Sequence, residues 1–506
     1  MSKIEIKNLT FGYESQGNLL FDHVNLNLDS NWKLGLIGRN GRGKTTFLKL
    51  LQNQLGYQGK ISSNLAFDYF PQPIANSKQL TFYVLNDLGV DEQWQVEREL
   101  NLLETDPDIL WREFASLSGG EQTKVLLASL FTQGVNFPLI DEPTNHLDIK
   151  ARDQVAAYLQ QKKQGFIVIS HDRHFVNQVV DHTLSIEKSN ILMYQGNFAV
   201  YEEQKKLSDL HEEMENTKLK KSISRLKQTA AEKAEWSRSK EGEKLGNPHK
   251  KGSGAVPNKG AIGARAARTM KRSLTLKRHM ENDIQSKEKL LKNIEYIDPL
   301  TMNFQPSYHE RLLTLKGVSL RYQDAKRPLF KPISFDLKKG NRIGVVGPNG
   351  SGKSTLIHAL LGNFLGQISG EIEQPKHLQI SYVRQSYEDN QGTIQEFAEQ
   401  HHLDYQEFLN NLHKLGLERN VFTTKIEHMS MGQQKKVELA KSLSVPAELY
   451  LWDEPLNYLD IYNQEQLETL ITSVKPSMLI IEHDREFIEH VTTDVVELKA
   501  MQSEHE

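Results

Sequence analysis

The chain of 506 residues repeats itself once along its length. Residues 38–46 read GRNGRGKTT and residues 347–355 read GPNGSGKST, an offset of 309. Farther along, three motifs recur at an offset of 312: LSGGEQ (117–122) as MSMGQQ (429–434), IDEPTNHLD (140–148) as WDEPLNYLD (452–460), and ISHDR (169–173) as IEHDR (481–485). Landmarks in the same order at nearly constant spacing indicate a tandem duplication. The chain must therefore fold as two similar domains.

Each copy alternates strand-like and helix-like runs. In the first copy WKLGLIG (32–38) leads through a glycine-rich turn into TTFLKLLQNQL (45–55). This alternation predicts an α/β fold for two tandem domains, each built on a mainly parallel sheet with helices on its faces. We place the copies at residues 1–200 and 308–500, a linker at 201–307 and a short polar tail at 501–506.

Composition excludes several classes of protein. The chain has no cysteine, which excludes a disulfide framework and a thiolate zinc site and fits a reducing cytoplasm. The polar start MSKIEIKNLTFGY predicts no secretory signal. The apolar runs FIVI (166–169) and MLII (478–481) have the length of buried strands and are too short to span a membrane. We therefore expect a cytoplasmic protein.

Both copies carry a glycine-rich loop between a strand and a helix. Glycine allows successive backbone N–H groups to point into one cradle, and the helix dipole adds to the attraction for phosphate. Lys44 and Lys353 are placed to reach the β- and γ-phosphates, and Thr45 and Ser354 to ligate Mg²⁺. A surface turn is the alternative, which two occurrences in one context disfavour. The loop glycines are Gly38, Gly41, Gly43, Gly347, Gly350 and Gly352.

An acidic pair closes an apolar strand in each copy, within FPLIDE (137–142) and LYLWDE (449–454). We expect Asp141 and Asp453 to join the Mg²⁺ shell, directly or through water. The next residues, Glu142 and Glu454, are then placed to polarise the attacking water. Surface carboxylates that merely end a strand are the alternative interpretation.

A histidine follows a second apolar strand in each copy, as His171 and His483. A lone histidine is more often structural than functional. Because this one recurs before Asp-Arg, we expect both to contact the γ-phosphate.

The order of phosphate loop, glutamine loop, LSGGEQ signature, acidic pair and switch histidine resembles that of ABC-type ATPases, and the resemblance covers both copies. It implies that the two nucleotide domains close head-to-tail within one monomer, hydrolysing ATP with Mg²⁺. Each ATP would then lie between one copy's phosphate loop and the other's signature. Lys44 would share its ATP with Ser430 and Gly432. Lys353 would share its ATP with Ser118, Gly119 and Gly120.

The same resemblance implies further contacts to nucleotide. Tyr13 and Tyr322 match the aromatic residue that stacks on adenine, although tyrosine on a first strand is often only packed. Gln72 and Gln385 match the glutamine that contacts ATP and the metal. The remaining loop positions assigned to ATP are Asn40, Thr46, Asn349 and Thr355.

The second copy departs from the family pattern at three positions. Met431 stands where the signature has its first glycine, and a side chain there could crowd the γ-phosphate. Leu456 replaces Thr144 of the first copy, and Glu482 replaces Ser170. Both catalytic glutamates are retained. The hypothesis is that the two sites turn over unequally, with the Lys44 site the altered one.

The segment between the copies has a different pattern. Residues 202–240 and 261–297 each carry apolar residues mostly three or four apart, which predicts two amphipathic helices. Glycines and prolines between them are too dense for a helix interior. The pattern therefore predicts an antiparallel helical hairpin with an irregular tip at about 241–262.

This linker is strongly basic within a chain of net charge −3. Residues 216–280 contain 18 Lys or Arg and four Glu, and residues 244–280 have no acidic residue. Glycines permit close approach to a phosphate chain and arginine offers forked donors, so the tip suits structured RNA. Simple solvation of a charged coiled coil is the alternative, stronger for the arms than for the tip. The candidate RNA contacts are Lys244, Lys250, Lys251, Val256, Pro257, Lys259, Arg265, Arg268, Lys271 and Arg272.

Two fused nucleotide domains with this linker resemble ABC-F proteins, which act on the ribosome. The resemblance implies that the tip approaches 23S rRNA near the peptidyl-transferase centre and P-site tRNA of the bacterial ribosome. The intervals 73–117 and 386–429 are nearly equal, so no arm is inserted in the first copy. With the run KGSGAVPNKGAIGARAARTMKR (251–272), this is similar to the antibiotic-resistance branch of Lsa/Vga type. That branch protects ribosomes from lincosamides, streptogramin A and pleuromutilins.

Three other functions remain open. A housekeeping factor would clear stalled ribosomes without any drug. A transporter's ATPase subunit would take its membrane domain from a partner, although transport needs no basic hairpin between the copies. A DNA-repair ATPase is disfavoured because the chain lacks the cysteines of that class's zinc modules.

Overall fold

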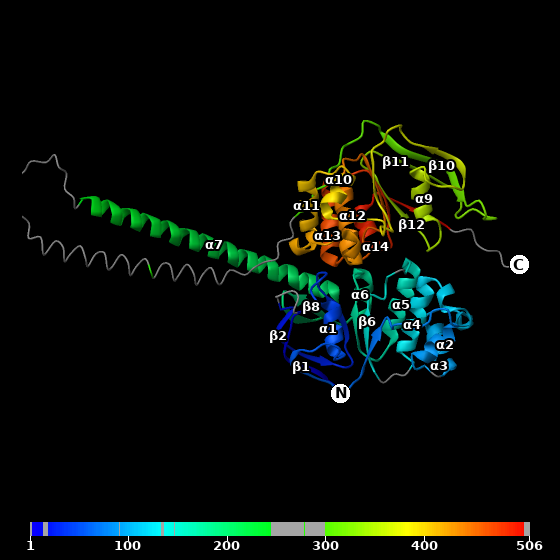
Figure 1. Cartoon of the computed structure of the whole chain (residues 1–506), viewed down its shortest axis with the longest axis horizontal. Coiled ribbons are helices and arrows are strands. Elements are labelled where there is room, and N and C mark those ends of the chain that lie inside the picture. The colour runs from blue at the N-terminus through cyan, green and yellow to red at the C-terminus, as the bar shows by residue number, and fades with distance from the viewer. Residues whose placement is uncertain are drawn as a thin grey trace, which may run out of the picture. The chain divides into compact units, whose positions relative to one another are not determined.

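A computed structural model describes residues 3–13, 19–90, 92–132, 136–145, 147–243, 278 and 299–499. The chain divides into two compact units: Met1–Tyr201 with Ile297–Glu506, and Glu202–Tyr296. The first unit contains both copies of the repeat (Figure 1).

The first copy is built on a six-stranded sheet of order β5-β6-β7-β3-β8-β9. All neighbours are parallel except the last pair. The buried strands β6 and β7 read as continuous apolar runs, as expected for strands covered on both faces. The strands are β3 (Lys33–Ile37), β5 (Phe67–Phe70), β6 (Phe137–Asp141), β7 (Phe166–Ile169), β8 (His182–Glu187) and β9 (Asn190–Gln195).

The second copy repeats this order in a parallel sheet, β14-β15-β16-β12-β17. Each copy adds a three-stranded antiparallel sheet, β2-β1-β4 or β11-β10-β13. The matching orders confirm the predicted tandem α/β fold. These strands are β1 (Lys3–Phe11), β2 (Phe21–Asp29), β4 (Gln58–Ser62), β10 (Arg311–Arg321), β11 (Ile333–Lys338), β12 (Arg342–Val346), β13 (Gln367–Glu373), β14 (Ile380–Val383), β15 (Leu449–Asp453), β16 (Met478–Ile481) and β17 (Asp494–Glu497).

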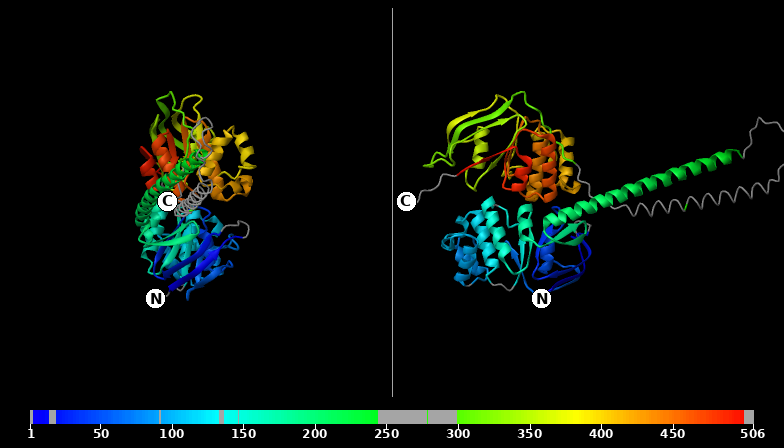
Figure 2. Two further views of the ribbon diagram at one scale, coloured as in Figure 1. Left: turned by 90° about the vertical axis from the view of Figure 1, so that its left-hand side faces the viewer. Right: turned by 180° about the vertical axis from the view of Figure 1, so that it is seen from behind.

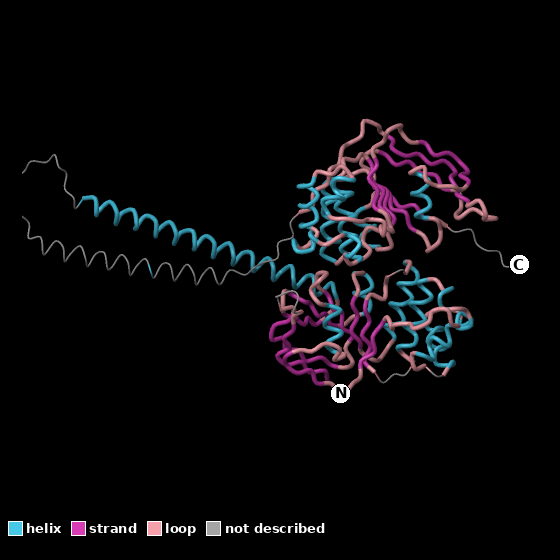
Figure 3. The backbone as a smooth tube through the Cα atoms, in the orientation of Figure 1, coloured by secondary structure: helices cyan, strands magenta, loops and turns pink. Residues whose placement is uncertain are grey.

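Most helices of each copy lie to one side of its strands, whereas the helix after each phosphate loop lies among the strands (Figures 1 and 3). Figure 2 gives the same separation from behind. The helices of the first copy are α1 (Lys44–Leu51), α2 (Thr81–Asp87), α3 (Gln93–Leu102), α4 (Gly119–Leu130), α5 (Ile149–Gln161) and α6 (Arg173–Val179). Those of the second are α9 (Lys353–Leu360), α10 (Ile394–Gln400), α11 (Tyr405–Lys414), α12 (Met431–Ser444), α13 (Ile461–Val474) and α14 (Arg485–Val491). Short 3₁₀ turns precede α4 and α12: η1 (Pro107–Trp111), η2 (Phe114–Ser116), η3 (Arg419–Thr423) and η4 (Ile426–His428).

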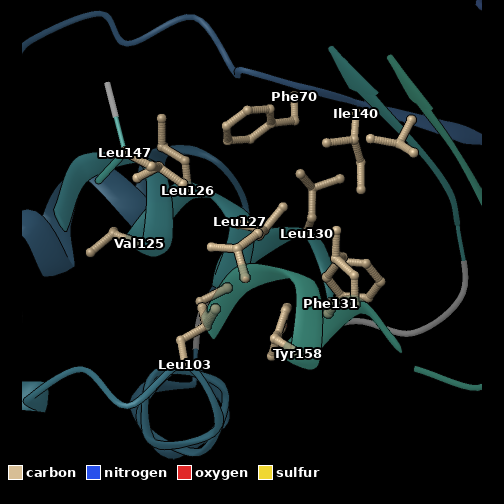
Figure 4. Packing of buried hydrophobic residues seen from close by; sticks show 14 of the residues in the cluster. Phe70, Leu103, Val125, Leu126, Leu127, Leu130, Phe131, Ile140, Leu147 and Tyr158 are labelled. Carbon is tan, nitrogen blue, oxygen red and sulfur yellow. The ribbon is translucent and has the colours of Figure 1, made fainter. Parts of the chain in front are cut away.

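Two apolar clusters hold each copy together. One packs the strands on the phosphate-loop helix, with Phe47 of α1 and Phe137 of β6 fully buried. The other packs the helices on the far side of the sheet, where Leu127, Phe131 and Tyr158 interdigitate (Figure 4). The second copy has the same two clusters. Burial on this scale fixes the strand ends that carry the candidate site.

Helix α7 (Phe198–Glu243) covers the predicted first arm of the linker and begins four residues before residue 202. Its apolar residues do not form one buried stripe. Leu207, Leu210 and Met214 are 62%, 54% and 63% exposed, whereas Ile223 is buried. The helix continues through residues 241–243, the first three of the predicted tip. The rest of the tip, the second arm and the tail at 501–506 lie outside the described residues, apart from Arg278.

Candidate functional site

The two phosphate loops adopt the same conformation at the strand–helix junction. Gly43 and Gly352 cap α1 and α9 with φ of 91° and 90°, a left-handed conformation that favours glycine. A β-carbon on Gly352 would lie 3.0 Å from Leu329 Cδ1. The left-handed conformation therefore favours glycine there, and the Leu329 side chain would have to shift to admit a β-carbon.

The loop lysines are buried and bonded to their own loops. Lys44 Nζ donates to Gly38 O at 2.7 Å and to Asn40 Oδ1 at 3.2 Å. Lys353 Nζ donates to Gly347 O and Pro348 O, each at 2.9 Å. Burial lowers the pKa of both lysines, opposed by nearby acidic groups that include Asp460 for Lys44 and Glu454 for Lys353. Each ammonium group is thus held inside its phosphate loop. A bound phosphate would take the place of the backbone carbonyl groups that the lysine now contacts.

The acidic pairs close β6 and β15 with an unusual backbone. Glu142 and Glu454 have φ of 53° and 48°, and their amides donate to Ile169 O and Ile481 O at 2.8 and 2.9 Å. A left-handed non-glycine residue costs on the order of 1–3 kcal/mol and persists only where the surroundings fix it. The same conformation in both copies aims each carboxylate away from the strand.

The aspartates predicted from the sequence to join the Mg²⁺ shell differ in their surroundings between the copies. Asp141 Oδ2 accepts hydrogen bonds from Thr45 Oγ1 at 2.8 Å and Tyr69 OH at 2.9 Å. Asp453 is fully buried, and neither carboxylate oxygen accepts a hydrogen bond of good geometry. Burial raises its pKa to about 6, against a contact from the Ser354 hydroxyl. A buried carboxylate without a well-formed hydrogen bond fits a site for a hard divalent cation, with Ser354 next to the loop lysine.

The glutamate–histidine pairs also differ. His171 Nε2 lies 3.0 Å from Glu142 Oε1, and His483 Nε2 lies 3.6 Å from Glu454 Oε1. Burial raises the pKa of Glu142, against the nearby charge of Lys44, and burial lowers the pKa of His171.

Glu454 is held in its ionised form instead. Burial alone would raise its pKa, but contacts from His483, Gln385 and Asn457 lower the pKa to about 2. Gln385 Nε2 donates to Glu454 Oε2 at 3.0 Å, and Asn457 Nδ2 donates to the same oxygen at 2.6 Å. The equivalent Gln72 bonds to α4 instead, with Nε2 3.1 Å from Ser129 Oγ and 3.4 Å from Leu126 O. The two glutamine loops therefore stand in different arrangements.

The signature serines begin helices α4 and α12. Ser118 Oγ accepts from Glu121 N and Ser430 Oγ accepts from Gln433 N, each within a capping box. A cavity of about 1040 Å³ brings Ser118, Gly119 and Gly120 together with Lys353 and Tyr322 of the other copy. At the other loop, a β-carbon on Gly432 would lie 3.6 Å from Asn40 Nδ2. Each phosphate loop thus faces the opposite signature.

Tyr13 and Tyr322 lie beside the loop helices as a matched pair. Their hydroxyls lie 3.1 Å from Thr46 Oγ1 and Thr355 Oγ1, and their rings are 37% and 50% exposed. A partly exposed ring anchored next to a phosphate loop can stack on a base.

Sequence reasoning missed the contacts that join the copies. Asp460 Oδ2 accepts from Asn40 N at 2.8 Å, and Asp148 Oδ2 accepts from Asn349 N at 3.3 Å. Both aspartates end repeated motifs, NHLD and NYLD. The repeated motif singles out both aspartates, but it does not predict that each one bonds to the phosphate loop of the other copy.

Two further missed residues follow the switch histidines, at the facing helices α6 and α14 (Figure 1). Arg173 NH1 lies 3.3 Å from Glu468 Oε1, and its NH2 donates to Ile461 O at 3.3 Å. Arg485 NH2 donates to Asp153 Oδ2 at 2.8 Å. Each arginine therefore reaches into the other copy.

The departures of the second copy have distinct surroundings. Met431 is 43% exposed. In the first copy Thr144 Oγ1 and Ser170 Oγ are hydrogen-bonded at 2.8 Å. In the second copy Glu482 replaces that pair by accepting from the amides of Leu456 at 3.1 Å and His483 at 2.8 Å.

The candidate RNA-binding residues, from Lys244 to Arg272, lie outside the described part of the chain. Across the described residues, no helix is long and apolar enough to cross a membrane. The same residues contain no cluster of three or more His, Cys, Asp or Glu arranged for a metal.

Comparison with known proteins matches this geometry. The sequence pattern of the ABC transporter family fits residues 21–145 and 330–457. The chain is 28% identical over 504 residues to the ribosome protection protein VmlR of Bacillus subtilis, covering 96% of this chain and 86% of VmlR. It is 26% identical over 532 residues to the ATP-binding protein Uup of Escherichia coli, covering 94% of this chain and 77% of Uup.

Among solved structures, the archaeal ribosome recycling factor aABCE1, crystallised with the ribosomal stalk protein aP1, has a TM-score of 0.64. The likeness covers 98% of this chain and 88% of aABCE1 at 20% sequence identity, which establishes a shared fold.

Proposed function

The chain belongs to the ABC transporter family, whose pattern it carries twice, and from that premise we propose that it is an ABC-F factor that protects the bacterial ribosome. It is an ATPase. The proposal adds the target: ATP closes the two copies, and the basic linker then reaches the drug and tRNA site near the peptidyl-transferase centre. The drugs would be lincosamides, streptogramin A and pleuromutilins.

One observation carries the proposal. The similarity to a ribosome protection protein extends over 96% of this chain, so it includes the linker as well as the nucleotide domains. The basic tip supports the same target, since residues 244–280 contain ten Lys or Arg and no acidic residue. The second candidate is a translation factor that acts on stalled ribosomes without drug, because a basic tip suits ribosomal RNA whether or not a drug is bound.

The chemistry follows from the described side chains. Phosphate would draw Lys44 and Lys353 from loop carbonyls, while the opposite signature helices would point their N-termini at the γ-phosphate. Mg²⁺, when bound, would neutralise phosphate charge and orient the phosphates, held by Thr45 and Asp141 or by Ser354 and Asp453. Gln72 and Gln385 complete the proposed metal sites.

Hydrolysis would depend on the paired glutamates and histidines. Glu142 and Glu454, fixed by their backbone conformation, would orient the attacking water. His171 and His483 would contact the γ-phosphate. Because closure needs both copies, ATP binding would act as the switch and hydrolysis as the release.

Sedimentation with ribosomes tests the target. We expect the double variant Glu142→Gln, Glu454→Gln to co-sediment with ribosomes in ATP but not in ADP, and to protect rRNA near the peptidyl-transferase centre from chemical probes. Deleting residues 244–262 should abolish both effects. A matched control replaces four exposed lysines of the second copy by glutamine: Lys326, Lys331, Lys338 and Lys339. Binding that ignores ATP or survives the deletion would refute the proposal.

Drug susceptibility separates the two candidates. Cells that express the intact chain should resist at least one of the three drug classes, and the deletion of 244–262 should restore susceptibility. Ribosome binding with unchanged susceptibility would favour the drug-independent factor.

The two ATP sites are predicted to turn over unequally, with the Lys44 site the slower one. Glu454 is held ionised by Gln385 and Asn457, whereas burial raises the pKa of Glu142. We therefore expect Glu454→Gln to remove more of the single-turnover hydrolysis than Glu142→Gln. Equal losses from the two variants would contradict this inequality.

A further inference from the structure

The phosphate loop of the Lys44 site touches a tyrosine of the other copy. The guanidinium carbon of Arg39 lies 5.2 Å from the ring centroid of Tyr462, a cation–π distance. Arg39 stands between Gly38 and Asn40, the two residues that accept hydrogen bonds from Lys44 Nζ. A phosphate that withdraws Lys44 from these acceptors therefore acts on both neighbours of Arg39.

The same loop is docked on the residues just before Tyr462. Asn40 N donates to Asp460 Oδ2 at 2.8 Å, and Asn40 Nδ2 donates to Tyr458 O at 2.9 Å. Asp460 also caps α13 by accepting from Asn463 N at 3.0 Å. The start of α13 is therefore tied to the loop at three positions, and a shift of the loop must strain or move it.

Tyr462 in turn meets the first turn of α7. Its hydroxyl lies 3.2 Å from Tyr201 OH, which lies 3.2 Å from Ser185 Oγ of β8. Tyr201 is 4% exposed and shares an apolar cluster with Phe198 and with Ile461 of the other copy. Burial, followed by Tyr201, raises the pKa of Tyr462, so its hydroxyl stays protonated and available for this bond.

The other ATP site lacks this contact. The repeat offsets place Pro348 at the position of Arg39 and Lys150 at the position of Tyr462. Proline has no cation, and lysine has no ring. Among the equivalent positions of the two described sites, the chain of contacts from loop to tyrosine exists at the Lys44 site alone.

We propose that Tyr462 is a positioning residue that couples the state of the Lys44 nucleotide site to the first turn of the linker helix α7. A movement of the phosphate loop displaces Arg39, and Tyr462 transmits that displacement from one copy to the other. Tyr201 then passes it to the first turn of α7. The coupling rests on the ATP-switched linker of the proposed function. It assigns the switch to one site, so the Lys353 site can turn over without the same effect on α7.

Hydrogen–deuterium exchange of the full chain tests the coupling without ribosomes. In the Glu142→Gln, Glu454→Gln background, ATP with Mg²⁺ should change the exchange of amides 198–206. Tyr462→Phe keeps the ring for Arg39 and removes the hydroxyl, so this change should shrink roughly fivefold, the worth of one hydrogen bond. Tyr201→Phe should have the same effect, and the two substitutions together should add nothing further.

Tyr308→Phe is the matched control, because Tyr308 is fully exposed, and it should retain the full response. ATP affinity is measured on every variant. If Tyr462→Phe weakens ATP binding, Tyr201→Phe, which removes the bond from the α7 side, decides the question. An unchanged ATP response in Tyr201→Phe, or no response in the background, would overturn the coupling. Because no ribosome is present, these outcomes are independent of ribosome binding.

Discussion

At the scale of single residues, the duplicated motifs have diverged in ways that preserve local bonding. Thr144 and Ser170 are hydrogen-bonded to each other in the first copy. In the second copy, Glu482 instead accepts hydrogen bonds from the backbone amides of Leu456 and His483. Glu482 is 1% exposed, and its pKa is raised to about 7, first by burial and against the hydrogen bond from the His483 amide. One buried carboxylate thus replaces a hydrogen bond between two hydroxyls. Because the carboxylate can ionise, the stability of the second copy depends on pH in a way that the hydroxyl pair does not.

Replacing Glu482 by glutamine should make that pH dependence visible. An acid whose pKa is raised in the folded state destabilises the fold as it ionises. The parent should therefore lose up to about 3 kcal/mol as pH rises from 5 to 8. Glu482→Gln cannot ionise, so its melting temperature relative to the parent should rise by roughly 5 °C over that range. The exposed Glu310→Gln serves as control, and a difference that stays constant with pH would contradict the assignment.

Asp453 permits a test by metal removal. Its two carboxylate oxygens accept no hydrogen bond of good geometry, and burial disfavours its charge, so Asp453→Asn should leave the nucleotide-free protein as stable as the parent or slightly more stable. Saturating Mg²⁺ and ATP, at about 100 times Kd, stabilise a folded site by about 2.7 kcal/mol. The variant should lose that gain at the Lys353 site. Differential scanning with and without EDTA measures both, and full retention of the gain would exclude Asp453 from the metal site.

Much at this scale could be predicted from the sequence, because loop glycines and strand-end carboxylates follow from local rules. Gly43 and Gly352 have the left-handed φ that a phosphate loop needs. The pairing of Gln385 with Glu454 and of Gln72 with α4 could not be predicted, since identical residue types take different partners. The same holds for Tyr462, whose neighbours Arg39 and Tyr201 come from two distant segments of the chain.

At the scale of elements, two signature helices begin with the same cap but fit against different surfaces. A β-carbon on Gly432 would lie 3.0 Å from Tyr458 O, a backbone atom, whereas one on Gly120 would lie 3.4 Å from Leu147 Cδ2, a side-chain atom. Helix α12 is therefore packed more tightly at Gly432 than α4 is at Gly120. The alternating pattern predicted a mainly parallel sheet in each copy. It did not predict that Leu207, Leu210 and Met214 of α7 are exposed, because helical spacing alone does not show what a helix packs against.

Alanine substitutions at the two glycines should separate the helices. Gly432→Ala forces a backbone atom to move and should weaken ATP-dependent turnover at the Lys44 site by roughly tenfold, the effect of a 1–3 kcal/mol overpacking strain. Gly120→Ala, the matched change, should weaken the Lys353 site by less than about threefold on the same grounds. Single-turnover hydrolysis in backgrounds with one glutamate intact measures each site. Equal effects would contradict the steric ranking.

At the scale of the whole molecule, the copies are joined by paired but unequal contacts. Arg173 is buried and reaches Glu468 and Ile461 O, while Arg485 is half exposed and pairs with the exposed Asp153. Neither pair was predictable, because each links residues about 300 positions apart with no periodic signal. The repeated HDR motif suggests that the two arginines are equivalent, but packing leaves Arg173 buried and Arg485 half exposed.

Truncating the two arginines should therefore have different consequences. Arg173→Ala leaves the mostly buried Glu468 with only His490, whose Nδ1 lies 3.8 Å from Glu468 Oε2, at a cost of about 3 kcal/mol. Arg485→Ala removes a solvent-screened pair worth about 0–1 kcal/mol. Thermal unfolding of the full chain in low and high salt compares them. A larger loss from Arg485→Ala would show that the Arg173 contact does not hold the copies together.

The aspartates Asp148 and Asp460 each bond to an amide of the opposite phosphate loop. Neither half of the gene therefore encodes a self-sufficient enzyme: a lesion in one repeat is felt at the neighbour's nucleotide.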